Sequence, residues 1–169
     1  MFGDLKRSKI IAQSAVFIAL IALGSWVSVP FFPVPLTLQT LFVLLAGAVM
    51  RRYAVIPVTL YILLGAMGLP LFHNGIAGLG ILLGPTGGYL IGFIPGALIV
   101  GLAYEAKADR VHVIGLAMAT LIIYACGISW LMYSTGMGFA AALVMGMLPF
   151  ILGDVIKASA AYMIAKRLP

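Results

Sequence analysis

Residues 6–29, KRSKIIAQSAVFIALIALGSWVSV, decide the fold class of this chain, because three basic residues stand directly before an uncharged run from Ile10 to Val29. An α-helix needs about 20 predominantly apolar residues to cross the ~30 Å hydrocarbon core of a bilayer. The run also lacks the Ala-x-Ala cleavage site of a secretion signal. We therefore expect it to remain in the protein as a first membrane span.

The same apolar character continues through all 169 residues. Hydrophobic residues make up 64% of the chain and charged residues 8%, against roughly 25% charged residues in an ordinary soluble domain. The mean hydropathy is +1.21. A soluble fold could not bury this much apolar surface, and the length suits about six spans joined by short connections. We expect a single all-α integral membrane domain covering residues 1–169.

The basic residues predict how the chain crosses the membrane. Three connections contain no Lys or Arg, namely residues 28–37, 68–84 and 134–144. Between them the Lys and Arg residues form four clusters, with only Lys157 outside: Lys6/Arg7/Lys9, Arg51/Arg52, Lys107/Arg110 and Lys166/Arg167. Cytoplasmic connections carry an excess of basic residues, so this alternation predicts six spans in the plasma membrane with both termini inside. The expected spans are residues 9–29, 36–50, 53–69, 85–104, 111–133 and 142–165.

The net charge of +6 is therefore explained by topology. A nucleic-acid partner, which a basic chain can also indicate, is not expected.

Two connections expected on the outer side are rich in proline and glycine. Residues 28–37 (SVPFFPVPLT) contain three prolines, and residues 68–88 read GLPLFHNGIAGLGILLGPTGG. The adjoining second and third spans are short, at ~22 and ~25 Å of helix. Irregular backbone at membrane depth must be buried or line a cavity. We expect these connections to cap a ligand cavity that faces outward, whereas Gly92 and Gly96 are explained by close helix packing alone.

Asp154 and Lys157, in PFILGDVIKASA (residues 149–160), are the charged residues inside an expected span. Their spacing places both on one helix face, and each alone at the bilayer centre would cost ~2.5–3.5 kcal/mol. Together they could bind a ureido or amide group, whereas Lys157 could instead meet a carboxylate. A purely structural ion pair is the alternative. Pro149 predicts a kink beside the pair, which favours a ligand site.

Other candidates are weaker. We expect His73 at the membrane interface rather than in contact with a ligand, and Tyr89 as either an interfacial aromatic or a pocket wall. The polar candidates near the outer side are Thr37, Gln39, His73, Asn74, Thr86 and Tyr89.

The first span carries a stripe of small residues. Such a stripe permits close approach of another helix, inside the bundle or in another membrane protein. Its members are Ala12, Ala15, Ala19 and Ala22.

Several motifs are missing from the sequence. It has no G-x-x-x-x-G-K-[ST] loop for ATP, no G-x-S-x-G and no H-E-x-x-H, so ATPase, hydrolase and metal chemistry lack their usual signals. Cys126 is the single cysteine, which excludes a disulfide within the chain. We predict no catalytic residue, metal site or cofactor, and expect Cys126 to be a packing residue.

Three segments together resemble the BioY family, the biotin-binding S components of energy-coupling factor (ECF) transporters. They are VPFFPVPLTLQTLFVLLAG (residues 29–47), GLPLF with LLGPTGGYLIGF (residues 68–72 and 82–93) and PFILGDVIK (residues 149–157). The resemblance implies a six-helix S component that captures biotin from outside. It also implies docking on a transmembrane coupling (T) protein with two ABC-type ATPases, whose ATP hydrolysis drives release inward.

The resemblance also implies roles for particular residues. Ligand contacts are implied for Asp154 and Lys157 and for the segment 84–89, which includes Thr86 and Tyr89. An Ala-x-x-x-Ala face on helix one that meets the coupling protein matches Ala15 and Ala19. The stretch HNGIAG (residues 73–78) departs from the glycine-rich connection of relatives and makes Asn74 a candidate ligand contact. Rival functions are an S component for riboflavin or thiamine, an intramembrane enzyme and a structural helix bundle.

Overall fold

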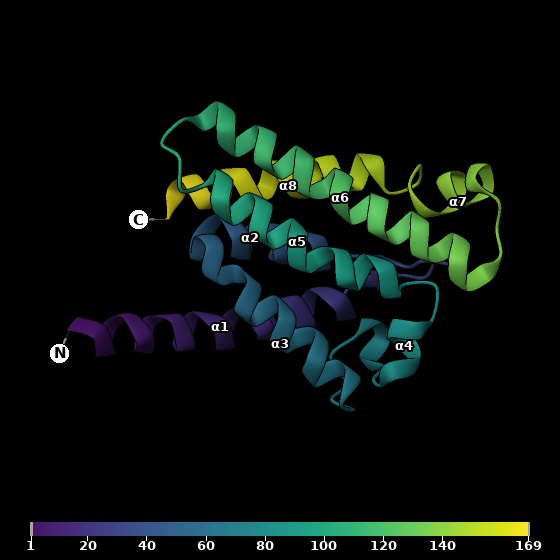
Figure 1. Ribbon diagram of the computed structural model, residues 1–169, viewed down its shortest axis with the longest axis horizontal. Helices are drawn as coiled ribbons and strands as arrows, with labels where there is room; N and C mark the ends of the chain where they lie inside the picture. Colours follow the sequence, from purple (N-terminus) through teal and green to yellow (C-terminus); the bar gives the residue numbers. More distant parts are fainter. Residues whose placement is uncertain (1, 169) are drawn as a thin grey trace.

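The computed structural model describes residues 2–168, and the surroundings of side chains from Asp4 onward. Most of this length is helical, and the two short strands pair antiparallel, Ser28 with Thr37 and Val29 with Leu36. The elements are α1 (Phe2–Trp26), β1 (Ser28–Val29), β2 (Leu36–Thr37), α2 (Gln39–Met50), the 3₁₀ turn η1 (Arg51–Ala54), α3 (Val55–Ala66), η2 (His73–Gly75), α4 (Leu79–Leu83), α5 (Gly87–Ala103), α6 (Asp109–Thr135), α7 (Phe139–Gly146) and α8 (Ile151–Arg167) (Figure 1).

Several helical stretches are suited to a bilayer by length and composition. Three could cross a membrane as they stand, and α7 with α8 makes a fourth although the two are bent by 51°. The helix α5 is apolar but shorter, at 17 residues. The three long stretches are Asp4–Trp26, Gln39–Ala66 and Asp109–Thr135.

The stretch Gln39–Ala66 contains two helices rather than one. The backbone turns at Arg51, whose φ of 56° is a conformation that residues other than glycine rarely adopt. On either side lie α2 and α3, with 12 residues each, or ~18 Å of helix at 1.5 Å per residue. Both are short, as the sequence predicted.

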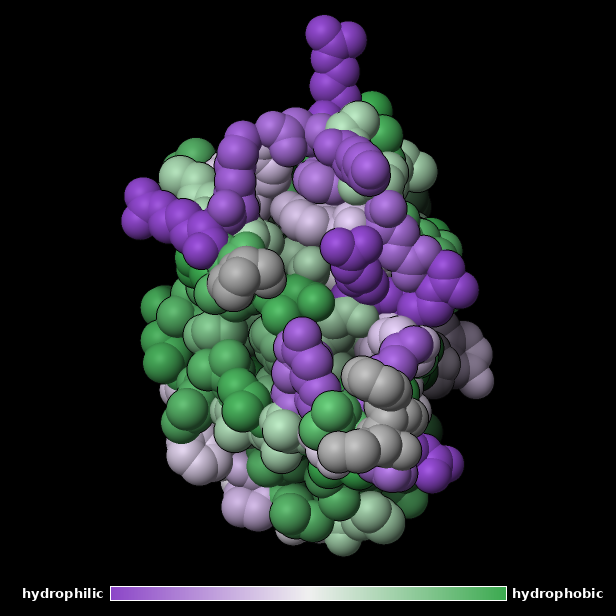
Figure 2. All heavy atoms as spheres, turned by 90° about the vertical axis from the view of Figure 1, so that its left-hand side faces the viewer, coloured by the Kyte–Doolittle hydropathy of each residue, from purple (hydrophilic) through white to green (hydrophobic). Residues whose placement is uncertain are grey.

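The four basic clusters meet at one end of the molecule, where both chain ends also lie (Figure 1). One residue from each cluster lines the same cavity there: Lys9, Arg51, Lys107 and Lys166. Figure 2 looks onto this end and shows hydrophilic residues gathered over much of it, beside an apolar flank. Clusters that are far apart in the sequence therefore share one end of the helix bundle.

Glycines allow α5 to lie close to α6. A Cβ atom at Gly88 would stand 2.2 Å from Cβ of Trp130, and one at Gly92 would stand 3.0 Å from Cβ of Cys126. Small residues at such contacts are a common means of helix association in membranes. Cys126 is accordingly a packing residue, as expected.

The last expected span, residues 142–165, is not one helix. The helix α7 ends at Gly146 and α8 begins at Ile151, with Pro149 between them. Proline removes a backbone donor and its ring clashes with the preceding turn, so the expected kink is a complete break. As a result Asp154 lies in the first turn of α8, where the positive end of the helix dipole stabilises a carboxylate.

Candidate ligand-binding site

A cavity of about 50 Å³ lies where α2, α5, α6 and α8 converge below the two Pro/Gly-rich connections. Five segments line it: residues 34–40, 72–73, 86–93, 123–124 and 150–157. Both connections therefore contribute to its wall, Pro35 from the first and Phe72 from the second. A cavity of this size holds only a few water molecules, so it must widen before a vitamin-sized molecule fits.

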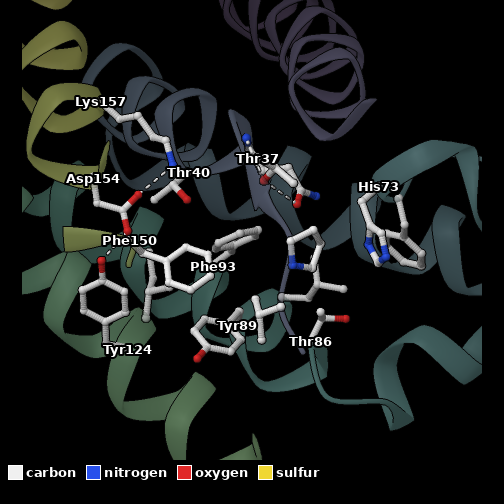
Figure 3. A pocket seen from close by; sticks show the side chains of 16 residues that line it. Thr37, Thr40, His73, Thr86, Tyr89, Phe93, Tyr124, Phe150, Asp154 and Lys157 are labelled. Carbon is white, nitrogen blue, oxygen red and sulfur yellow. Dashed lines mark hydrogen bonds and ion pairs between the residues drawn. The ribbon is translucent and has the colours of Figure 1, made fainter. Parts of the chain in front are cut away.

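One end of the cavity is formed by a buried acid–amine pair. Asp154 and Lys157 are only 6% and 9% exposed. Lys157 Nζ donates a hydrogen bond of 2.8 Å to Asp154 Oδ1, and the hydroxyl of Tyr124, on α6, donates to Oδ2 of the same carboxylate. Figure 3 shows the three side chains together, with Thr40 beside Lys157. Both Asp154 oxygens thus already accept a hydrogen bond.

The pair can still bind a polar group. An ammonium carries three N–H donors, and in the described part of the chain the one acceptor that Lys157 reaches is Asp154. Each carboxylate oxygen has a second lone pair. An acceptor and a donor therefore lie side by side in an apolar setting, where hydrogen bonds to charged groups are about twice as strong as neutral ones.

The rest of the cavity is aromatic in the middle and polar at the far end. Phe93, Phe150 and Tyr89 lie between the acid–amine pair and the opposite end, where His73 and Thr86 are found (Figure 3). Burial lowers the pKa of His73 below its ordinary value of 6.5, so the ring is neutral at pH 7. The site therefore has one charged end, an apolar middle and one neutral polar end.

The structure places some of the weaker candidates in the wall. Tyr89, Thr86 and Gln39 all line the cavity. Two of them are also occupied elsewhere: Tyr89 Oη donates to the carbonyl of Gly146 at 2.7 Å, and the Gln39 amide donates to the hydroxyl of Tyr61. Tyr89 therefore fastens α7 to α5 in addition to facing the cavity.

The structure places the neighbours His73 and Asn74 differently with respect to the cavity. His73 lines the cavity, although we expected it at the interface. Asn74 is exposed and is not among the lining residues, and its side-chain oxygen accepts a hydrogen bond of 2.6 Å from Ser28 Oγ. Asn74 therefore ties the second connection to the first.

The second connection is anchored to the bundle through its first residues. Leu71 O accepts hydrogen bonds from Ser25 Oγ at 2.6 Å and from Tyr61 Oη at 2.9 Å. Phe72 is fully buried and fills the space left by Gly65, where a Cβ atom would stand 2.4 Å from the ring. These contacts hold the wall of the cavity in place.

Four residues that line the cavity were not singled out in the sequence: Tyr124, Phe93, Phe150 and Thr40. Tyr124 carried a usable signal, because the hydroxyl of a buried tyrosine usually needs a hydrogen-bond partner, and Asp154 is an acceptor expected in a neighbouring span. The two phenylalanines are indistinguishable in sequence from other core aromatics.

The small-residue stripe on α1 points away from the bundle. Ala12, Ala15 and Ala19 are exposed, whereas Ala22 is buried. Packing inside the bundle, one of the two explanations for the stripe, is therefore wrong for three of the four alanines. The face of α1 that packs against the bundle instead carries Phe17 and Ile21, which are buried.

These features define an α-helical membrane protein in which a buried acid–amine pair faces a small-molecule pocket. The BioY family model matches residues 3–169. The chain is 44% identical to the "Biotin transporter BioY" of Thermotoga maritima, over 92% of this chain and 93% of the relative. It is 40% identical to the "Probable biotin transporter BioY" of Pyrococcus horikoshii, over 96% and 97%.

The fold also matches a solved structure that is described as the S-component for biotin from an ECF-type ABC transporter. The TM-score is 0.86 at 27% sequence identity, and the match covers 96% of this chain and 91% of the solved one. This chain belongs to the BioY family.

Proposed function

We propose that this protein binds biotin in the cavity between α2, α5, α6 and α8 and takes it up as the S component of an ECF-type importer. The observation that carries the proposal is the buried Asp154–Lys157 pair at one end of the cavity, in a chain of the BioY family. The protein is a binding and transport subunit rather than an enzyme.

The chemistry of biotin suits the two ends of the cavity. Its ureido ring presents N–H and C=O side by side, so Asp154 accepts from the N–H while Lys157 donates to the carbonyl. The fused rings and the aliphatic chain then lie against Phe93 and Phe150. The carboxylate of the ligand points toward His73, at the neutral polar end. Because the free volume is about 50 Å³, the side chains of the wall move outward as the ligand enters.

The uptake cycle depends on the arrangement in the membrane. The proposal has six crossings of the plasma membrane, by α1, α2, α3, α5, α6 and the broken pair α7–α8, with both termini in the cytoplasm. Basic residues gathered at one end support this orientation. The exposed Ala15 and Ala19 meet the transmembrane coupling protein, whose two ABC-type ATPases hydrolyse the ATP.

Calorimetric titration of the detergent-purified protein with biotin tests the assignment. We expect tight one-to-one binding, which Asp154→Asn and Lys157→Ala each weaken by at least ~10-fold, or ~1.4 kcal/mol. The exposed Arg110→Ala is the matched control and leaves the affinity unchanged. Riboflavin and thiamine should fail to compete. A folded protein that does not bind biotin, or that prefers another vitamin, would overturn the proposal.

The methyl ester of biotin tests the orientation of the ligand separately. If the ureido ring meets Asp154 and Lys157, the ester keeps most of its affinity, and Lys157→Ala weakens the ester and the acid alike. If the carboxylate meets Lys157, the ester binds far more weakly than the acid. In that case the Lys157→Ala variant no longer distinguishes the two ligands.

A further inference from the structure

A second cavity, unrelated to the biotin pocket, lies at the end of the molecule that carries the basic clusters. It encloses about 590 Å³. Four basic and two acidic side chains line it, an excess of two positive charges: Lys9, Arg51, Lys107 and Lys166, with Glu105 and Asp109. The hydrophilic side chains in Figure 2 surround this end.

The acidic residues of this cavity are already neutralised. Asp109 pairs with Lys166 at 2.8 Å, and Glu105 pairs with Arg52. In the described residues, Lys9 and Lys107 form no ion pair with any carboxylate. The hydroxyl of Tyr104, which also lines the cavity, is buried and has no hydrogen-bond partner within residues 2–168. The cavity therefore offers two unpaired ammonium groups, with the unused hydroxyl of Tyr104 buried in its wall, and these donors match an anionic oxygen group.

An apolar groove of about 500 Å³ adjoins the cavity and runs between α6 and α8. It extends along α8 from Ile151 to Met163, or ~18 Å at 1.5 Å per residue. The hydrogen-bonded residues Tyr124 and Asp154, which also line the biotin pocket, form part of its wall. The groove is therefore separated from the biotin pocket by a single pair of side chains.

Tyr162 joins the cavity to the groove, because its side chain lines both. Its hydroxyl lies 3.5 Å from Lys166 Nζ, at the polar side. One molecule with an anionic head and an apolar tail would fill both spaces, with the head among the basic residues and the tail along the groove. A soluble anion would leave the groove empty.

We propose that this continuous surface is a binding site for an anionic phospholipid, whose phosphate lies near Lys9, Lys107 and Tyr104 while one acyl chain follows the α6–α8 groove. On the topology proposed above, this end faces the cytoplasmic leaflet, where basic pockets between membrane helices suit anionic headgroups. None of the headgroup residues lines the biotin pocket, whereas the groove shares Tyr124 and Asp154 with it.

Native mass spectrometry of the protein, released from vesicles of equal parts phosphatidylglycerol and phosphatidylcholine, tests the proposal. We expect retained phosphatidylglycerol in excess over phosphatidylcholine. Lys9→Ala with Lys107→Ala should reduce retention by ~5-fold or more, because these two ammonium groups line the cavity and would contact the phosphate directly. Arg7→Ala with Arg110→Ala removes the same charge outside the cavity and should leave retention unchanged. An equal loss in both pairs, or no preference for phosphatidylglycerol, would overturn the proposal.

A variant in the groove tests the role of the acyl chain. Ser159→Trp, whose side chain enters the groove, should lower phosphatidylglycerol retention, whereas Ile156→Trp, on the exposed side of α8, should not. Biotin affinity stays at its original value in both variants, which shows that they are folded. If glycerol phosphate without acyl chains displaces the lipid, or if Ser159→Trp retains it fully, the site binds a soluble anion and the lipid assignment is wrong.

Discussion

Asp154 accepts hydrogen bonds from two directions, from Lys157 on its own helix and from Tyr124 on α6. The Tyr124 contact fixes where the carboxylate points, because a carboxylate held from both sides cannot rotate away from the cavity. The same two side chains also line the α6–α8 groove. Tyr124 therefore positions the residue that we expect to meet the ureido ring, without having to contact the ligand itself.

Tyr124→Phe should weaken biotin binding by roughly 3- to 10-fold, since a single hydrogen bond contributes ≈ 0.5–1.5 kcal/mol. The ring is retained, so the packing of α6 is unchanged. Calorimetry measures the effect, and Tyr133→Phe, at a side chain that is 82% exposed, is the matched control. Unchanged affinity in Tyr124→Phe would mean that Lys157 alone orients the carboxylate.

Replacing both members of the charged pair separates their structural role from their binding role. Asp154→Leu with Lys157→Met should leave thermal stability near the original value, because apolar substitutes for a buried ion pair are often neutral or stabilising. Either substitution alone leaves a buried charge unpaired and should cost ~3–5 kcal/mol. Biotin binding should be lost in the double variant. A double variant that still bound biotin would show that the pair does not recognise the ligand.

Among the elements, the connection between α3 and α5 depends most on tertiary contacts. It contains only the short helices η2 and α4, and its first part is held by Phe72. That ring packs edge-to-face on Tyr61, with centroids 5.7 Å apart. Since His73 follows directly and lines the cavity, the position of the polar end of the cavity depends on this anchor.

Phe72→Ala should loosen the connection and accelerate biotin dissociation. Truncating a buried phenylalanine costs ~3–5 kcal/mol of stability. If about 1.4 kcal/mol of this cost destabilises only the biotin-bound state, biotin dissociates tenfold faster. Exchange of labelled biotin against excess unlabelled biotin measures the rate. Leu69→Ala, at a half-exposed position of the same connection, should have little effect. Equal rates in the two variants would contradict a role for the anchor.

For the whole molecule, the exposed alanines of α1 and the basic end have different roles. The exposed alanines are small and suit close approach of a second helix bundle, while the basic end is expected to orient the chain. Binding of biotin requires neither feature, because the cavity is complete within one chain. We expect ATP-driven transport, in contrast, to require this external surface.

Ala15→Trp with Ala19→Trp should abolish ATP-driven biotin uptake in cells that contain the coupling protein and its ATPases. Two bulky side chains prevent the close approach that small residues allow. Biotin affinity of the purified variant should equal that of the original protein. Met118→Trp, at an exposed position on α6, is the control and should transport normally. Uptake that persists in the double alanine variant would place the coupling surface elsewhere.

The sequence by itself determined the membrane class, the grouping of the basic residues and the shared face of Asp154 and Lys157. These features follow from local hydrophobicity, charge and helical periodicity, which neighbouring residues specify without reference to the rest of the chain. The short α2 and α3 followed in the same way from the lengths of their apolar runs. Resemblance of three segments to the BioY family supplied the ligand and the partner.

Only the tertiary structure decided which side chains complete the site. Tyr124 and Asp154 are 30 residues apart, and Ser28 and Asn74 are 46 apart, so no local pattern relates them. Three further features likewise depend on how whole helices pack: the complete break at Pro149, the position of His73 in the cavity wall and the outward face of Ala15 and Ala19. Contacts between distant segments set these features, because the orientation of a side chain around its helix is fixed by the neighbours that its helix acquires.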